Sequence, residues 1–178
     1  MKLNPWTSSV FVVISLCVVL FFGIRNNTTH NDSTPIDLDL ITNAQMEEVV
    51  EKNPQVLGMR MSLANRYLAE GNFSSALHHY MFISSNDITN EFKPTALAQI
   101  GWMTYESGKT MLALEYIKES IRLNPDNILA NTYLGIVLLE QDFNKEEGLA
   151  ILNRVLSSYT LTSLEKEIIN EYIEKYDK

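Results

Sequence analysis

Cysteine and clustered basic residues are the features that this chain has least of. The 178 residues contain one cysteine, Cys17, and it lies inside an uncharged apolar run. The rest of the chain therefore has no thiol for a disulfide, a redox centre or haem attachment. Lysine and arginine number 14 against 22 acidic residues, which gives a net charge of −8, and no basic cluster could follow a phosphate backbone. We therefore expect no nucleic-acid partner.

Recognisable catalytic motifs are also missing. The chain has no G-x-S-x-G element, no glycine-rich phosphate loop and no His, Cys and carboxylate set at metal-ligand spacing. His78 and His79 are adjacent, and neighbours on a helix point about 100° apart, which suits solvated or groove-rim histidines better than ligands of one metal. Glu146 and Glu147 fit the first turn of a helix, where carboxylates are favoured. The sequence therefore predicts no enzyme, no catalytic residue, no metal site and no cofactor.

A long apolar run near the N-terminus is the first informative feature that is present. From Val10 to Ile24 no residue is charged, and 12 of the 15 are Val, Ile, Leu or Phe. Each of these favours insertion near a bilayer centre by roughly 0.3 to 0.6 kcal/mol. Counted from Trp6, the helix reaches roughly 28 Å at 1.5 Å per residue, close to the hydrocarbon thickness. We therefore predict a transmembrane helix within residues 1–25, with residues 6–24 in membrane lipid.

The run fits an uncleaved signal anchor better than a cleaved signal peptide. No A-x-A-like cleavage site follows it, and Arg25 comes immediately after it. Lys2 before the run and Arg25 after it give one positive charge on each side, so the positive-inside rule does not decide the orientation. The short leading segment favours an N-terminus on the cytoplasmic side. The following domain would then be periplasmic or otherwise extracytoplasmic. Residues 26–40 are polar and contain Pro35, which predicts a flexible tether.

A repeated pattern of small, large and helix-ending residues follows, most clearly from Leu97 to Pro125. In this copy Gly101 lies on one face of a first helix, Gly108 breaks the chain, and Ala113 lies on one face of a second helix. The spacing resembles the tetratricopeptide repeat (TPR), a helical hairpin of about 34 residues with small residues at fixed positions. Two less regular copies flank it, which gives repeats of about 57–90, 94–127 and 128–161.

The repeat predicts an all-α fold, because each hairpin leaves an apolar face for the next one to cover. The steps from Ala76 to Ala113 and from Ala113 to Gly148 are 37 and 35 residues, so we expect the additional residues in turns. Residues 41–55 resemble a capping helix at the front. We predict a transmembrane helix followed by a TPR domain at 41–178, an α-solenoid of about three hairpins with flanking capping helices, the last at 162–178.

The closing helix has its own start signal and apolar stripe. Thr162 and Glu165 have the spacing of a capping box. The residues expected in the stripe recur at helical spacing, and they are Leu164, Ile168, Ile169, Tyr172, Ile173 and Tyr176.

The TPR resemblance implies where a partner binds. In this family the first helix of each hairpin lines a concave groove, which receives a peptide segment of a partner protein. Carried over position by position, the groove residues are Met61, Asn65, Leu68, Ala98, Trp102, Tyr105, Thr132, Ile136 and Leu139.

The groove residues also indicate the kind of peptide. Asn65 matches the asparagine that holds a ligand carboxylate in chaperone-binding members, but Met61 and Leu129 stand where that clamp needs basic residues. The groove should therefore prefer an apolar or aromatic segment. Trp102 and Tyr105 would offer their rings to it. The alternative is that Trp102 packs against the neighbouring helix.

The layout of one anchor, about three repeats and a terminal helix is similar to the TPR subunits of cytochrome c maturation and haem lyase complexes. That resemblance implies a membrane-anchored scaffold that binds a partner peptide and assists cytochrome c-type biogenesis. Two alternatives stay open. One is a generic scaffold for envelope assembly or secretion, and the other is a cytosol-facing TPR adaptor with the opposite membrane orientation.

Overall fold

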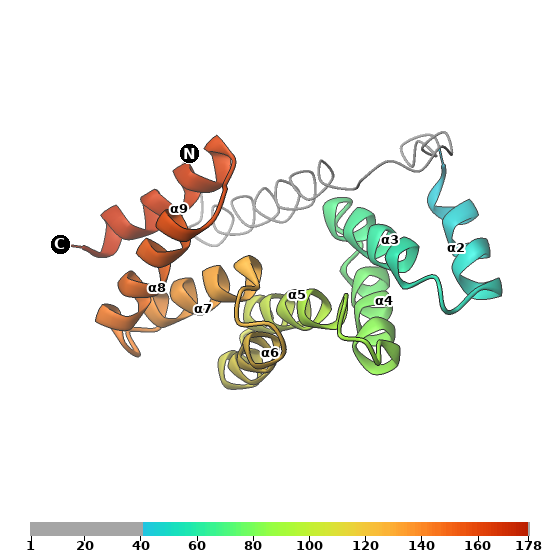
Figure 1. Ribbon diagram of the computed structural model, residues 1–178, viewed down its shortest axis with the longest axis horizontal. Coiled ribbons are helices and arrows are strands. Elements are labelled where there is room, and N and C mark those ends of the chain that lie inside the picture. Colours follow the sequence, from blue (N-terminus) through green and yellow to red (C-terminus); the bar gives the residue numbers. More distant parts are fainter. Residues whose placement is uncertain (1–40, 178) are drawn as a thin grey trace.

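The computed structural model describes residues 41–177, and this part of the chain is entirely helical (Figure 1). It contains eight helices and no strand, which confirms the all-α fold class. Within these residues no helix combines the length and the apolarity that crossing a membrane requires. The predicted span at residues 6–24 and the predicted tether at 26–40 lie outside the described residues.

The helices pack as consecutive pairs. They are α2 (Asn43–Lys52), α3 (Leu57–Ala69), α4 (Phe73–Asn86), α5 (Lys93–Glu106), α6 (Thr110–Leu123), α7 (Ile128–Glu140), α8 (Lys145–Ser158) and α9 (Ser163–Tyr176). The pairs α3 and α4, α5 and α6, and α7 and α8 each form a hairpin. Contacts of α4 with α5 and of α6 with α7 join the hairpins into a row, with α2 packed on α3 at one end and α9 on α8 at the other (Figure 1).

The turns inside the hairpins depend on residues that tolerate left-handed backbone. Gly71 and Gly108, with φ of 76° and 84°, lie between the helices of the first and second hairpins. Such angles are readily adopted only by glycine, with Asn and Asp next. The third turn has no glycine, and Asp142 takes φ of 52° there. This turn spans residues 141–144, one residue longer than the other two, so the additional residue of the last repeat lies in it.

Both end helices begin with capping boxes. The Thr162 side chain accepts a hydrogen bond from the Glu165 amide while the Glu165 carboxylate accepts one from the Thr162 amide, as the sequence predicts. Thr42 and Gln45 do the same for α2. In the stripe of α9, Ile168, Ile169 and Tyr172 are buried, Ile173 and Tyr176 are partly buried, and Leu164 is 39% exposed. The first turn of α9 buries Glu165 instead, which is 3% exposed.

In the second and third hairpins, the two helices come into close contact at small residues. A Cβ atom built on Gly135 of α7 would lie 2.7 Å from Leu152 and 3.3 Å from the carbonyl oxygen of Gly148 on α8. On Gly101 of α5 it would lie 3.1 Å from the carbonyl oxygen of Ala113 on α6, the contact that the repeat spacing predicts. Larger side chains at these positions would hold the helix axes apart. The small residues therefore set the spacing inside these two hairpins.

The loop between α4 and α5, residues 87–92, is organised by one carboxylate. Asp87 is 3% exposed and accepts hydrogen bonds from the amides of Thr89, Phe92 and Lys93 at 3.0, 2.6 and 2.8 Å. Burial by itself would raise the pKa of Asp87, but these hydrogen bonds outweigh it and hold the pKa below its usual value. Asp87 thus fixes the longest connection in the array, which carries the additional residues before the second hairpin.

The close contact at Gly135 in the third hairpin predicts how one added methyl group changes the stability of the protein. Gly135→Ala should destabilise the protein by about 1 to 3 kcal/mol, because the overpacking penalty exceeds the roughly 0.5 to 1 kcal/mol that alanine gains in a helix. Urea unfolding measures the change. Gly58→Ala in α3 is the control, since its Cβ would lie at an ordinary 3.4 Å from Phe92. Equal midpoints for the two variants would contradict the proposed role of the contact.

The Asp87 carboxylate predicts a pH-dependent contribution to stability. Asp87→Asn should lower the free energy of unfolding at pH 7 by about 1 to 3 kcal/mol, because charge-assisted hydrogen bonds are lost. A carboxyl group whose pKa is lower in the folded state stabilises the fold above its unfolded pKa, about 3.9, and loses this effect in acid. The difference from wild type should therefore shrink below about pH 4. Asp142→Asn, on an exposed turn, should change little.

Candidate functional site

The predicted groove residues lie on the first helix of each hairpin, as the repeat implies. Met61, Asn65 and Leu68 are on α3, Ala98, Trp102 and Tyr105 are on α5, and Thr132, Ile136 and Leu139 are on α7. The structure brings the α5 and α7 sets together, because these helices pack against each other. All nine are buried except Asn65 and Tyr105, which are partly exposed. The partly exposed pair is therefore the portion of the set that solvent reaches.

Trp102 lies in an aromatic contact between α5 and α7. Its ring centroid is 4.6 Å from that of Tyr133 and 5.2 Å from that of Tyr105, and the side chain is 3% exposed. This packing against the neighbouring helix is the alternative that the sequence left open for Trp102. Tyr133 could not be selected from the sequence, because its position in the repeat is not one that lines the groove. Its hydroxyl donates to Gln99 of α5 at 3.3 Å.

Asn65 is bound within its own hairpin. Its side-chain oxygen accepts a hydrogen bond of 2.5 Å from the Tyr80 hydroxyl of α4. Tyr80 is fully buried, so this bond gives its hydroxyl a partner that water cannot supply there. Asn65 therefore has a structural role in addition to its place on the inner face.

Tyr105 joins α5 to the end of α7. Its hydroxyl donates to the Glu140 carboxylate at 2.7 Å and accepts from the Gln141 amide at 3.0 Å. Burial, and then the bond to Glu140, raise the pKa of Tyr105 well above its ordinary value, so the phenol stays a donor at neutral pH. Burial and the Glu140 charge also raise the pKa of Glu106. The inner face thus ends in tyrosine and carboxylate groups rather than in a basic clamp.

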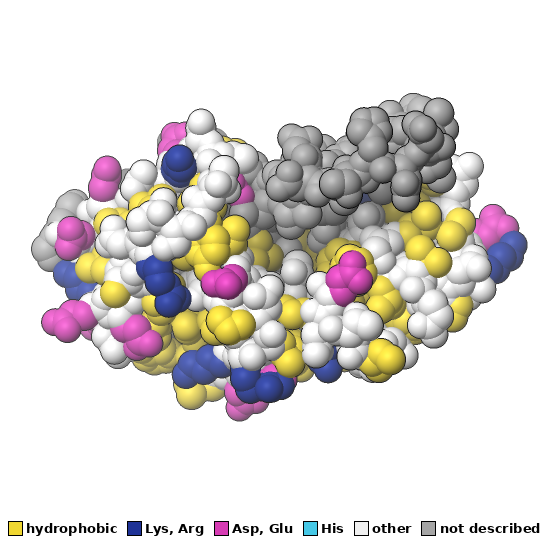
Figure 2. Space-filling model, viewed as in Figure 1, with side chains coloured by type: hydrophobic (Ala, Val, Ile, Leu, Met, Phe, Trp, Pro, Cys, Tyr) yellow, Lys and Arg dark blue, Asp and Glu magenta, His cyan; other side chains and the backbone are white. Residues whose placement is uncertain are grey.

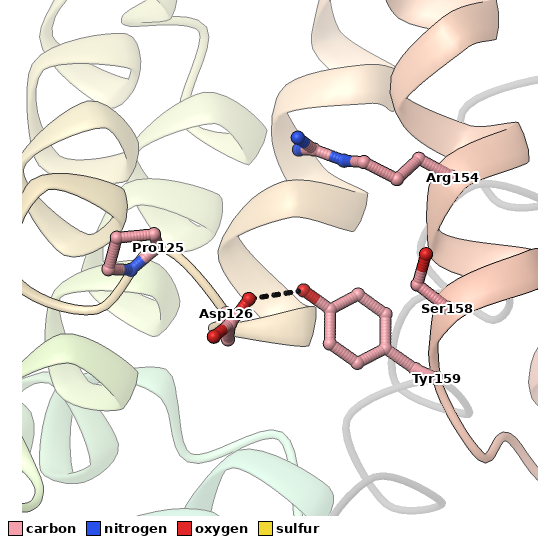
Figure 3. A pocket seen from close by; sticks show the side chains of 5 residues that line it. All are labelled: Pro125, Asp126, Arg154, Ser158 and Tyr159. Atoms are coloured by element: carbon pink, nitrogen blue, oxygen red, sulfur yellow. Dashed lines mark hydrogen bonds between the residues drawn. The ribbon is translucent and has the colours of Figure 1, made fainter.

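A separate hollow of about 480 Å³ lies between the α6 to α7 turn and the end of α8 (Figure 3). Its lining residues are Pro125, Asp126, Arg154, Ser158 and Tyr159. Arg154 donates to the buried Asn131 at 2.7 Å. Tyr159 donates to Asp126 at 3.2 Å across the hollow (Figure 3). The hollow is open to solvent and its charged groups already have protein partners, so we assign it no ligand.

His79 differs from the sequence prediction of a solvated or groove-rim histidine. It is 2% exposed, because α2 packs beside α3 and brings Glu47 to within 3.0 Å of its Nε2 atom. Its neighbour His78 is exposed, as predicted. In residues 41–177 no group of three His, Cys, Asp or Glu side chains is placed to hold a metal ion.

On the face shown in Figure 2, acidic and basic side chains are interspersed with apolar ones. Comparison with protein-family models, with curated proteins and with solved structures found no match for this chain.

Proposed function

We propose that this chain is a TPR-like scaffold that binds a segment of a partner protein along the inner face formed by α3, α5 and α7. The observation that carries the proposal is the repeated hairpin, in which the first helices present residues of equivalent position from three successive units. Helical repeat arrays characteristically bind partners on the concave surface that the repeats create. No catalytic role enters the proposal.

The chemistry of the inner face supports an apolar or aromatic segment as the ligand. Met61, Leu68, Ala98 and Ile136 make the helices of this face apolar, but all four are buried in the main core cluster and shape the face from beneath. Tyr105 lies at its partly exposed end with both an aromatic ring and a fixed hydroxyl. Tyrosine in such a position often carries interface energy, since it combines a large contact area with a hydrogen bond. Tyr105 is therefore the residue that we assign first to the partner.

The proposal also includes attachment to a membrane through residues 6–24, with the repeats on the extracytoplasmic side. The membrane attachment is inferred from the uncharged apolar run of the sequence. The identity of the bound partner protein decides the pathway. The candidate pathways are cytochrome c maturation, envelope assembly or secretion, and a cytosol-facing adaptor role. They differ in the partner that is bound and in the side of the membrane on which it is bound.

Membrane orientation has a direct test. A reporter enzyme that is active only outside the cytoplasm, fused after Lys178, should be active in cells that make the full chain. A cytoplasmic reporter at the same position should be inactive. The reverse pattern would support the adaptor alternative and reject the extracytoplasmic placement.

Site-specific photocrosslinking tests the binding face. A benzophenone amino acid in place of Tyr105 should give a covalent adduct with a partner protein in cells, because the partner would lie within a few ångströms of it. The same amino acid in place of Glu115, an exposed residue of α6, is the control and should give none. Equal adducts at both positions, or only an adduct of twice the mass of this chain, would contradict the assignment.

Once the partner is captured, its affinity measures the contribution of the ring. Tyr105→Ala should weaken binding by about 2 kcal/mol, roughly 30-fold, as truncation of an interface tyrosine typically does. Tyr116→Ala on α6 is the matched control, since Tyr116 is also partly buried against the core. An equal loss in the two variants would indicate general destabilisation instead of a contact.

A further inference from the structure

Helix α2 is attached to the first hairpin through contacts that converge on one buried histidine. Nε2 of His79 lies 3.0 Å from the Glu47 carboxylate of α2, and Nδ1 lies 3.2 Å from Nη1 of Arg60 on α3. Arg60 in turn donates through Nη2 to the carbonyl oxygen of Val50 on α2 at 2.6 Å. His79 is therefore linked to α2 by two routes, directly through Glu47 and indirectly through Arg60.

These partners determine which ring nitrogen of His79 carries the proton. A guanidinium group has only donors, so Nδ1 of His79 must accept from Arg60. The proton of the neutral ring is then on Nε2, where it donates to Glu47. Both ring nitrogens are thus fully used by the neutral form, with α2 in place.

A second proton on His79 has no place in this arrangement. It would set an N–H group against the Arg60 guanidinium at 3.2 Å, with the loss of a hydrogen bond and two positive charges side by side. The Tyr67 ring is stacked on the imidazole at 5.7 Å, and Arg60 is held over the Phe82 ring at 3.9 Å, which restricts movement of both groups. Burial lowers the pKa of His79, and Arg60 and His78 act in the same direction against Glu47.

The other ionisable groups around His79 come from three helices. Glu47 and Glu51 are on α2, and Arg60, Arg66 and Tyr67 are on α3. Glu70 is the residue that caps the end of α3, and His78 is on α4. Burial and the bond to Glu47 raise the pKa of Tyr67 to about 12, so its phenol stays neutral. Histidine is the side chain whose ordinary pKa, about 6.5, lies in the mildly acidic range. The two residues that an experiment must separate are therefore His79 and the exposed His78.

Other contacts also hold α2. The Tyr67 hydroxyl of α3 donates to the Glu47 carboxylate at 2.8 Å, and Arg66 donates to the Met46 sulfur at 3.1 Å. The buried residues Met46 and Val50 of α2 form a small cluster with Leu63 that is separate from the main core. Asn43 also donates to Glu70 at 2.8 Å, and Arg66 donates to the carbonyl oxygen of Ile41. A helix of ten residues is not stable by itself in water, so its structure depends on these contacts.

We propose that His79 is a pH-dependent switch for α2. The helix stays docked on the first hairpin while His79 is neutral and is released when His79 takes up a proton. Release would uncover Leu63, which is fully buried in the docked form. Because the released state binds one more proton below about pH 6.5, the equilibrium constant for release should rise by up to about tenfold per pH unit there. Above that pH, His79 contributes no pH dependence.

Hydrogen exchange of the full chain in mild detergent tests the switch. Protection of the α2 amides, corrected for the intrinsic rate at each pH, should fall on going from pH 7.5 to 5.5, by as much as tenfold for each unit below about 6.5. The amides of α9, a terminal helix of comparable length, give the internal reference. Unchanged protection of α2 relative to α9 would overturn the proposal.

Two variants assign the effect to one residue. His79→Gln keeps an acceptor for Arg60 and a donor for Glu47 but does not titrate, so it should leave α2 protected at both pH values. His78→Gln should keep the full pH dependence. Loss of protection at pH 5.5 in His79→Gln would overturn the assignment. If His79→Gln fails to dock α2 at pH 7.5, an NMR titration of the His79 ring in the wild type decides, and a pKa at or above 6.5 would exclude the switch.

Discussion

Close contact between two helix backbones is the constraint on which the array depends. Gly101 faces Ala113 in the second hairpin and Gly135 faces Gly148 in the third, and at these positions the backbone of one helix touches the side chains and carbonyl oxygens of the other. The close spacing keeps each hairpin thin, so that both of its broad faces are available for contacts outside the hairpin. One face packs on the next hairpin, and in the last two hairpins the first helices, α5 and α7, also pack on each other.

Stacking of the hairpins also determines which residues of the inner face a partner can reach. Because α5 packs on α7, Trp102 and Tyr133 occupy the space between them and become part of the structure. A residue on the inner face is therefore available to a partner only where no neighbouring first helix covers it. Tyr105 and Asn65 are the two groove positions that stay partly exposed, and Tyr105 does so although its hydroxyl is fixed by Glu140 of α7. The proposed binding role rests on this remaining surface.

The two ends of the array are closed in different ways. At the C-terminal end, Ile168, Ile169 and Tyr172 of α9 join the main core, so that end is held by apolar burial. At the N-terminal end, α2 shares only a small separate cluster and relies on hydrogen bonds through Glu47, Arg60 and His79. The stabilisation from apolar burial changes little with pH, whereas the charge of a histidine, and so the hydrogen bonds it can make, changes in the mildly acidic range. The proposed pH dependence of α2 docking follows from this difference between the two ends.

The sequence by itself determined the helices, their pairing and their ends. Helical periodicity, Gly71 and Gly108 in the turns and the capping residues Thr162 and Glu165 are local signals, and each appears in the structure where the sequence places it. Only the tertiary structure decided which side chains are accessible. Trp102 is buried by Tyr133 and His79 by α2, in each case by a residue or helix more than 25 positions away. Exposure depends on such distant neighbours, and a repeat pattern specifies positions within a unit without specifying what the next unit covers.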